Sequence, residues 1–240
     1  MSSRHSLAFA TLLRRSFPHA SLSDNWQSGA GAHLDSREGF LVIKCTATSI
    51  SRGEGRIISD FSFEFLTGIY VVKGPNGSGK STFLLSLLGE VPLAGGSVTI
   101  DRRDLASLSE QGRCATYSWY EDQEIAFNFT AKDVLGWGGW SIGMADELVA
   151  EELLDRQWKR LSRGERARVL LTSVLAKTCP HYLLDEPAAG LDDSMILKLA
   201  SILTEKARDG AVVIISEHDL RLISALDAKV LTIHGGLLTE

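Results

Sequence analysis

Apolar and polar residues alternate in the first half of the chain and form longer apolar runs further on. Between Asp60 and Phe65 the alternation places Phe61, Phe63 and Phe65 on one side, which predicts a strand with one buried face. Further β-type stretches cover residues 40–50, 69–73, 181–184, 211–215 and 230–233. We expect a turn at residues 51–56, and another at residues 234–236 after the last strand.

Helical patterns lie between these strands. Residues 80–88 are apolar nearly all round, which predicts a buried helix. Apolar residues at helical spacing predict an amphipathic helix at Ala167, Leu170, Leu171, Val174 and Leu175. Asp192 can cap a helix that reaches about Arg208, with Gly210 placed to end it. Strands that alternate with helices predict an α/β domain with a largely parallel sheet.

The N-terminal part of the chain differs from the rest in amino-acid composition. Residues 20–39 are rich in Ser, Gly, Ala and Asp and have no apolar period, which predicts a linker. No acid precedes Asp24, a composition typical of a disordered basic tail or of an organelle transit peptide. A secretory signal fits less well, because Arg14 and Arg15 follow the short apolar stretch. We therefore expect a disordered basic, Ser/Gly-rich extension over residues 1–39 and one domain over residues 40–240.

Composition narrows the function. The 240 residues carry a net charge of −5 and are 44% hydrophobic, which suffices for a core and argues against a dedicated nucleic-acid binder. Cys45, Cys114 and Cys179 have neither the number nor the spacing of a disulfide framework or zinc site, so we expect free thiols in a reducing compartment. No apolar run approaches the roughly 18 residues that span a bilayer, and we expect any membrane role to be peripheral.

One segment matches the phosphate-binding pattern GxxxxGK[ST] between a predicted strand and a predicted helix. Glycines let the backbone wrap a phosphate with its N–H groups, and the helix presents its positive end to the same anion. Lys80 adds a charge at the β- and γ-phosphates, and the Ser81 hydroxyl suits Mg²⁺. The candidate nucleotide contacts here are Gly74, Pro75, Asn76, Gly77, Ser78, Gly79, Lys80, Ser81 and Thr82.

Two acidic residues follow the predicted strand at 181–184. Ligands gather at the carboxyl ends of parallel strands, so Asp185 can reach a magnesium ion. Glu186 faces the γ-phosphate side and can accept a proton from the attacking water.

With these residues in place, the chain resembles the nucleotide-binding subunit of ATP-binding cassette (ABC) proteins over residues 40–240. The motifs that carry the resemblance are GPNGSGKS (74–81), LSRGE (161–165), YLLDEP (182–187), AGLD (189–192) and SEHD (216–219). Many NTPases share the phosphate loop, whereas LSxG in this order and spacing is specific to the family. The resemblance implies an α/β P-loop NTPase fold of the ABC type: a mostly parallel core sheet, an antiparallel β subdomain and a short helical subdomain at about 124–165.

The resemblance also implies residue roles. Two copies face head to tail, and Ser162, Gly164 and Glu165 of one copy contact the ATP on the other. Residues 189–192 resemble the loop that couples the two sites, and His218 resembles the switch histidine. The implied catalytic residues are Glu186, His218 and Lys80.

Three features depart from the family pattern. Arg163 replaces the second glycine of LSGG. The aromatic that stacks on adenine is missing from residues 49–56, where Arg52 or Arg56 can stack instead. The usual glutamine after the strand near 115–121 is also displaced; Gln123 is the nearest candidate for the magnesium site, and Glu121 can supply an oxygen.

The resemblance implies an ATP-hydrolysing subunit that uses ATP and Mg²⁺, pairs with a second copy or a related chain, and serves separate membrane-spanning subunits. Such a subunit lies in the cytoplasm against the inner face of the membrane, or in mitochondria. The motifs look most like small exporter-type cassettes, including cytochrome c maturation haem exporters. A soluble ATPase of an assembly system, such as iron–sulfur cluster biogenesis, shares every motif. A binding module without turnover is disfavoured by the intact Lys80, Asp185, Glu186 and His218.

A cluster of tryptophans, Trp137, Trp140 and Trp158, has two interpretations: the core of the helical subdomain, or a docking groove for a membrane partner.

Overall fold

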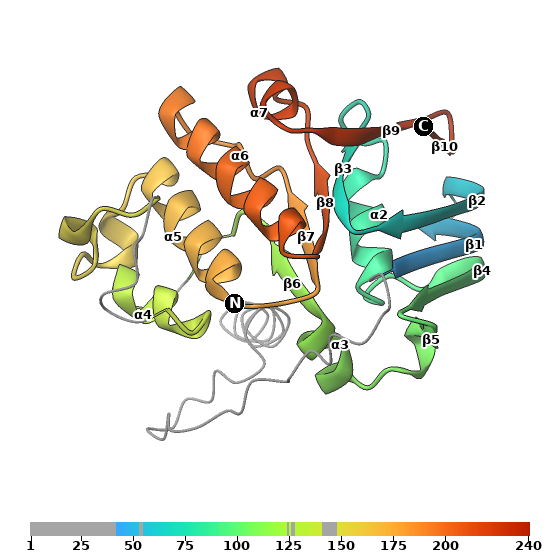
Figure 1. Cartoon of the computed structure of the whole chain (residues 1–240), viewed down its shortest axis with the longest axis horizontal. Helices are drawn as coiled ribbons and strands as arrows, with labels where there is room; N and C mark the ends of the chain where they lie inside the picture. The colour runs from blue at the N-terminus through green and yellow to red at the C-terminus, as the bar shows by residue number, and fades with distance from the viewer. Residues whose placement is uncertain (1–41, 53–54, 124, 126–127, 141–147) are drawn as a thin grey trace.

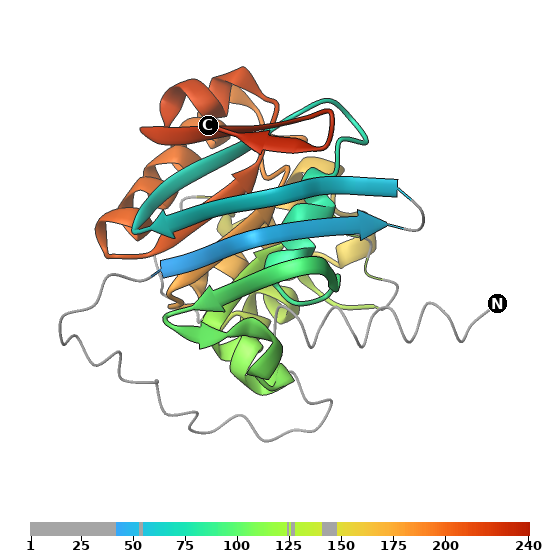
Figure 2. The same ribbon diagram turned by 90° about the vertical axis from the view of Figure 1, so that its right-hand side faces the viewer.

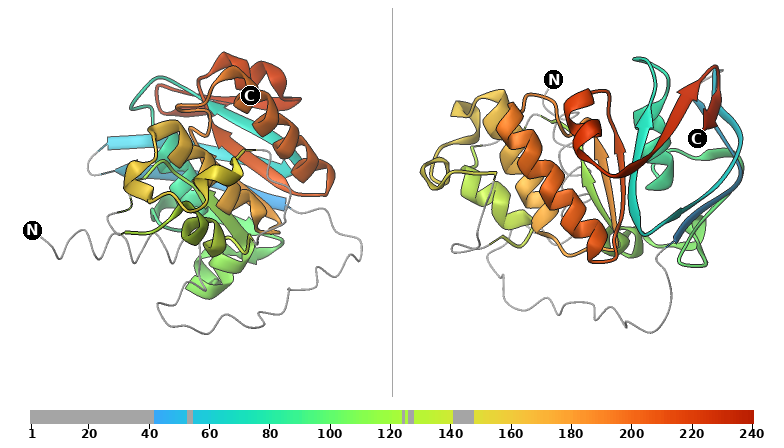
Figure 3. Two further views of the ribbon diagram at one scale, coloured as in Figure 1. Left: turned by 90° about the vertical axis from the view of Figure 1, so that its left-hand side faces the viewer. Right: turned by 45° about the horizontal axis from the view of Figure 1, so that its top comes forward.

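The chain folds in layers, as the computed structural model shows for residues 42–52, 55–123, 125, 128–140 and 148–240. A four-stranded antiparallel sheet and a six-stranded sheet enclose helix α2 between them (Figure 1). On the far face of the six-stranded sheet two helices, α5 and α6, pack against the strands and a third, α4, packs against α5 (Figure 3). These helices are α4 (Ala131–Trp137), α5 (Arg163–Ala176) and α6 (Asp193–Arg208), while α2 spans Lys80–Leu87. The predictions for residues 1–39 lie outside the described residues.

The six-stranded sheet confirms the predicted parallel α/β core. Its order is β10-β9-β3-β8-β7-β6, and only β10 runs antiparallel to its neighbour. The strands are β3 (Gly68–Lys73), β6 (Tyr117–Tyr120), β7 (His181–Asp185), β8 (Val212–Ser216), β9 (Ala228–His234) and β10 (Leu237–Thr239). The prediction that residues 230–233 form the last strand was wrong, because the chain turns at Gly235 and Gly236 and pairs β10 back onto β9.

The antiparallel sheet has the order β2-β1-β4-β5 (Figure 2). Its strands are β1 (Val42–Arg52), β2 (Gly55–Leu66), β4 (Leu93–Ile100) and β5 (Arg103–Asp104). The predicted turn at 51–56 is too long, because Ser51 pairs with Arg56 and Arg52 with Gly55. Polar side chains misled the prediction there, since strand pairing is made by the backbone and continues wherever a hairpin keeps its register.

Alternate residues of the central strands face two separate cores. In β3, Ile69 and Val71 pack with α5 and α6, whereas Tyr70 and Val72 pack with α2 and the antiparallel sheet. Burial on both faces explains why these strands read as continuous apolar runs in the sequence. The arrangement also leaves the loops after β3, β7 and β8 at one edge of the sheet.

The helices begin and end largely where the sequence predicts. Asp192 caps α6 by accepting a hydrogen bond from the Met195 N–H at 3.0 Å, and Gly210 follows the helix with a φ of +99°. Short helices occupy the range of the predicted helical subdomain: α4, a 3₁₀ turn at Glu151–Leu153 and another at Trp158–Arg160. Two further short helices are α3 (Glu110–Thr116) and α7 (Leu220–Ala225). Within the described part of the chain, no helix has the length and apolar character needed to cross a bilayer.

The tryptophans of the helical region mainly serve the core. Trp158 is 1% exposed, and Trp137 and Trp140 pack against the same buried cluster. The Arg166 guanidinium lies 5.9 Å from the Trp158 ring centre. This burial favours the core interpretation of the cluster.

The three cysteines are buried free thiols, as the sequence predicts. Burial raises the pKa of Cys45 to about 12, so the thiol stays protonated at neutral pH and is a poor nucleophile.

Helix α2 is held between the two sheets by a cluster of aromatic rings. The fully buried ring of Phe83 meets Phe61 edge-on with centroids 5.9 Å apart, and Phe65 lies 6.2 Å away. Because α2 follows the phosphate-loop motif directly, this packing fixes the position of the loop relative to the sheet.

We expect Phe83→Ala to lower the free energy of unfolding by about 3–5 kcal/mol, because it leaves a cavity between the sheets. Urea denaturation followed by circular dichroism measures the change. Leu197→Ala is the control, since Leu197 is 64% exposed on α6 and its truncation should change stability by less than about 0.5 kcal/mol. Equal midpoints for Phe83→Ala and the wild type would show that α2 does not hold the two sheets together.

Candidate functional site

A loop between β3 and α2 carries the predicted phosphate-binding residues. The N-terminal residue of the helix is Lys80, and Phe83 N–H donates to Gly79 O at 2.8 Å. Gly79 has a φ of +102°, and a Cβ there would lie 2.0 Å from Ile57 Cγ2. Only glycine fits at this position, so the sequence motif is explained by backbone geometry and close packing.

Two polar groups in this loop lack the partners that their burial calls for. Lys80 is 6% exposed, and its Nζ donates to Gly74 O at 3.1 Å and lies 4.0 Å from Glu186 Oε1. An ammonium has three donors, so these contacts leave donor capacity in the loop. Ser78 Oγ is buried without a hydrogen-bond partner among the described residues. A phosphate group held in the loop would satisfy both, and the residues present therefore fit a nucleotide.

An open groove of about 390 Å³ lies against this loop. It is lined by Ile57, Asn76, Gly77, Gly79, Lys80, Ser81, Thr82 and Glu186. None of these described lining residues is aromatic, which agrees with the missing adenine-stacking residue. Of the two predicted substitutes, Arg56 is exposed on β2 and does not line the groove, while the Arg52 side chain lies outside the described residues. Ile57 lines the groove instead, a contact that the sequence analysis missed.

The carboxyl end of β7 brings Glu186 to the groove, and Asp185 directly precedes it as the last residue of the strand. Asp185 Oδ1 accepts a hydrogen bond from Ser216 Oγ, and Glu186 N–H donates to Ser216 O at 3.0 Å. Glu186 has a φ of +48°, a conformation that costs a non-glycine residue about 1–3 kcal/mol and is concentrated at functional sites. This backbone turn directs the Glu186 side chain towards Lys80.

His218 reaches the same place from the end of β8. Its ring is 63% exposed, and Nδ1 lies 3.7 Å from Glu186 Oε1 and 3.8 Å from Glu217 Oε1. The structure therefore brings together Lys80, Glu186 and His218, the three residues predicted to be catalytic. A phosphate-binding loop, a carboxylate and an imidazole at one groove can bind a nucleotide phosphate and manage a proton beside it.

The predicted signature residues lie at the N-terminus of α5. Ser162 Oγ accepts from Glu165 N–H at 3.2 Å, and Ser162 N–H donates to Glu165 Oε2 at 2.7 Å, which forms a capping box. The hydrogen bond from the Ser162 backbone is the main reason that the pKa of Glu165 lies below its usual value. Arg156 also pairs with Glu165 at 2.9 Å.

The signature residues do not meet the phosphate loop of their own chain. The described residues that line the groove do not include Ser162, Gly164 or Glu165, and α5 lies on the opposite side of the six-stranded sheet from α2 (Figure 1). Gly164 instead packs on the loop after β7, where its added Cβ would lie 2.6 Å from Gly190 O.

The loop after β6 differs from the sequence-based picture. Gln123 is partly buried there and is not among the described residues that line the groove. Its neighbour Asp122 receives two hydrogen bonds from the Arg163 guanidinium at 3.1 and 3.2 Å. Arg163, the departure from LSGG, therefore ties the signature segment to this loop.

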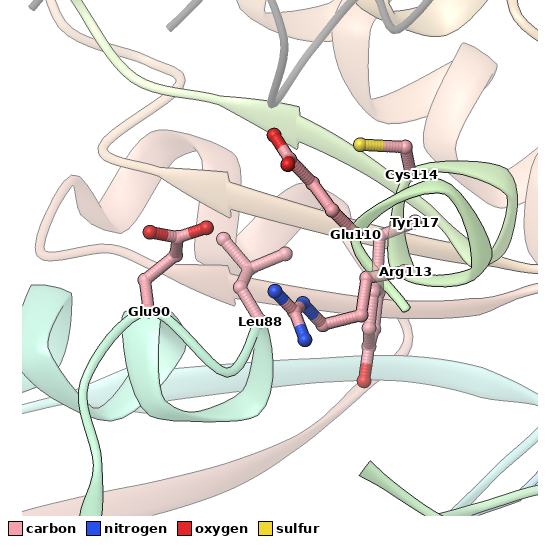
Figure 4. Close-up of a pocket in the computed structure, with 6 residues that line it drawn as sticks. All are labelled: Leu88, Glu90, Glu110, Arg113, Cys114 and Tyr117. Carbon is pink, nitrogen blue, oxygen red and sulfur yellow. The ribbon is translucent and has the colours of Figure 1, made fainter. Parts of the chain in front are cut away.

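A second cavity lies at the other end of α2 (Figure 4). Its volume of about 20 Å³ has room for roughly one water molecule. It is lined by Leu88, Glu90, Glu110, Arg113, Cys114 and Tyr117. It is far too small for a nucleotide. The groove against the phosphate loop is the candidate binding site because the phosphate-binding residues line it.

Sequence reasoning missed the residues that support the candidate catalytic groups from behind. Ser216 bonds both Asp185 and Glu186, and Glu217 is fully buried. The signal was present in the motif SEHD, where two polar residues end an otherwise apolar strand, but the resemblance assigned a role only to His218.

Comparisons with known proteins identify the family of the chain. Residues 58–189 match the sequence profile of the ABC transporter family. The hemin import ATP-binding protein HmuV of Nocardia farcinica is 34% identical over 222 residues, which cover 82% of this chain and 76% of that protein. HmuV of Rhodococcus jostii is 30% identical over 214 residues, covering 82% and 73%. These transporter names give no support to the assembly-system alternative.

Solved structures share the fold. A bacterial Atm1-family ABC exporter with ATP bound has a TM-score of 0.69 at 22% identity, covering 84% of this chain and 39% of that chain. The ATP-binding subunit of an ABC transporter has a TM-score of 0.70 at 21% identity, covering 82% and 88%. At these identities the likeness concerns the fold, which confirms the predicted α/β P-loop NTPase architecture. Together with the family match and the relatives, it shows that the chain belongs to the ABC transporter family, as the ATP-binding and ATP-hydrolysing subunit of a membrane transporter.

Proposed function

We propose that residues 74–82 hold the phosphates of Mg·ATP and that Lys80, Glu186 and His218 carry out its hydrolysis. The convergence of these three side chains on the groove at the phosphate loop supports the proposal most directly. Ser81 and Asp185 would hold Mg²⁺, whereas Gln123, which is not among the described residues that line the groove, is a ligand candidate from the sequence alone. Hydroxyl and carboxylate oxygens suit this ion, which is commonly bound through one or two protein groups and the phosphates themselves. When bound, it would neutralise charge on the β- and γ-phosphates.

In this proposal the three side chains divide the chemistry. A water oxygen forms a bond to the γ-phosphorus, and the bond from that phosphorus to the bridging oxygen of ADP breaks. Glu186 accepts the proton of the attacking water, His218 holds the γ-phosphate beside Glu186, and Lys80 stabilises negative charge on the phosphate oxygens.

The signature residues support a second copy as part of the site. Ser162, Gly164 and Glu165 lie at the N-terminus of α5, away from the groove of their own chain. A helix N-terminus is favourable for an anion. We infer that these residues close over the ATP of a partner chain in a head-to-tail dimer, with the segment 189–192 beside them.

Separate membrane-spanning subunits would be driven by this cycle of ATP binding and hydrolysis. ATP would favour the closed dimer, and hydrolysis would reopen it, which shifts the attached subunits between two states. We place the chain against the cytoplasmic face of a membrane, with mitochondria as the alternative compartment. The exporter type stays a prediction, and the relatives named for hemin import make a haem importer the first membrane partner to seek by affinity purification from solubilised membranes.

Lys80→Ala should weaken ATP binding by about 10- to 100-fold, because it removes a charge-assisted contact from a buried site. Fluorescent-nucleotide titration measures the affinity. Lys44→Ala is the control, since Lys44 pairs with Glu64 on an exposed face of the antiparallel sheet and should leave the affinity unchanged. Unaltered affinity in Lys80→Ala would refute the assignment of the phosphate loop.

Glu186→Gln should lower kcat by about 10²- to 10⁴-fold while ATP stays bound, because the amide cannot accept the proton of the attacking water. Phosphate release gives the rate, and light scattering after gel filtration shows whether Mg·ATP holds the variant as a dimer. Glu64→Gln, on β2, is the matched control. Hydrolysis by Glu186→Gln at the wild-type rate would exclude Glu186 as the base.

Mixing two inactive variants should restore hydrolysis if each site is shared between chains. Ser162→Asp keeps a good helix cap but places a carboxylate at the proposed γ-phosphate contact. A dimer of Ser162→Asp with Lys80→Ala has one site with an intact phosphate loop and an intact signature. We expect each variant alone to be inactive. An equimolar mixture should recover about a quarter of the wild-type rate, because about half of the dimers are mixed and each of these has one intact site of two. No recovery, with mixed dimers verified by differential tagging, would contradict the head-to-tail arrangement.

A further inference from the structure

The segment after β8 contains a carboxylate that is almost completely withdrawn from solvent. The Glu217 side chain is 1% exposed, and burial of a carboxylate is strongly unfavourable unless hydrogen bonds replace its water. Three backbone N–H groups do so. Oε1 accepts from His218 at 2.7 Å and Asp219 at 2.9 Å, and Oε2 accepts from Ala188 at 3.1 Å.

The two oxygens of this carboxylate serve two different loops. Oε1 holds the backbone of the loop that carries His218, and Oε2 holds the loop that leaves β7 after Glu186 and leads to residues 189–192. The Glu217 backbone N–H also donates to Val72 O at 3.2 Å, in the strand that precedes the phosphate loop. One residue thus connects the ends of the three strands that form the site.

The same carboxylate lies against the imidazole. His218 Nδ1 is 3.8 Å from Glu217 Oε1 and 3.7 Å from Glu186 Oε1. Because the His218 ring is mainly exposed, its position depends on its backbone and on these two carboxylates. A shift of about 1 Å in a group beside the reacting atoms can change a rate by about 100-fold.

We propose that Glu217 is a positioning residue for hydrolysis, whose carboxylate holds the His218 loop and the loop from Ala188 to Asp192 in one geometry. The inference rests on the proposed function, because it assumes that His218 acts on the γ-phosphate and that residues 189–192 meet the partner chain. It adds that the Glu217 side chain sets both the position of His218 and the position of the loop that contacts the partner's site.

Glu217→Gln tests this with nearly the same shape. The amide has one acceptor oxygen, and its NH₂ group must face the N–H of one loop or the other. We expect kcat to fall by about 10- to 100-fold with KM and nucleotide affinity within about 3-fold of wild type, since the phosphate loop is untouched. We also expect the Hill coefficient for ATP to fall towards 1, because the two sites are no longer coupled.

Thr48→Val is the matched control for loss of a buried hydrogen bond. Thr48 is fully buried in the antiparallel sheet, and its Oγ1 donates to Ser97 O at 3.0 Å. The variant should lose stability and keep the wild-type kcat. An equal loss of kcat in both variants, or a wild-type kcat and Hill coefficient in Glu217→Gln, would overturn the proposal.

A double-mutant cycle with His218→Ala separates positioning from general damage. If Glu217 acts through His218, Glu217→Gln should lower kcat little further in the His218→Ala background. If the kcat of the double variant falls by the product of the two single losses, the proposal is contradicted. Should Glu217→Gln fail to fold, Glu217→Asp, which keeps the charge and shortens the reach, is judged by the same criteria.

Hydrogen exchange gives a readout that does not depend on activity. The amides of Ala188, His218 and Asp219 should exchange about 10-fold faster or more in Glu217→Gln, and those of Thr48→Val should match the wild type. If these amides exchange faster in Glu217→Gln while the wild-type protein hydrolyses no ATP, the connection between the loops holds and the proposed function is refuted instead. Unchanged exchange at both loops would overturn the inference.

Discussion

Parallel pairing in register between β3, β8 and β7 is the constraint on which the site depends. Val72 pairs with Ser216, and Ser216 pairs with Asp185, so the three strands end at the same level. The residues that follow the three strands are then neighbours, although more than a hundred positions separate β3 from β7 and from β8 in sequence. A slip of one residue in either pairing would turn the apolar side chains of β8 to the wrong core and separate Glu186 from His218.

The strand ends also hold Glu186, the proposed base, in an unfavourable backbone conformation. Glu186 keeps its φ of +48° because Ser216 accepts its N–H with both the backbone carbonyl and the hydroxyl. The two cores beneath, on either face of the sheet, prevent these strands from relaxing. The packing on both faces of the sheet thus keeps the strained backbone of Glu186 in place beside the groove that we propose as the site of hydrolysis.

Much of this could be predicted from the sequence, because the elements that hold the site leave local signals. The phosphate loop, the apolar strands and the cap of α6 depend on residues close together along the chain. The extra strand β10 did not show because three residues are too few to carry a periodic pattern. The extended hairpin of β1 and β2 did not show because backbone pairing does not need apolar side chains. Glu217 was missed for a different reason: its partner Ala188 lies 29 positions away, and a buried glutamate looks like a surface residue in sequence.

The contact between Gly164 and Gly190 bears on how two copies meet. The backbones of the start of α5 and of the loop after β7 touch there directly. A Cβ added to Gly164 would lie only 2.6 Å from Gly190 O, so no side chain fits between the two segments. The two segments therefore behave as one rigid unit. In the proposed dimer an approaching chain would press on both segments at once, so that closure over a bound nucleotide would move them together. A residue larger than glycine at position 164 would force them apart.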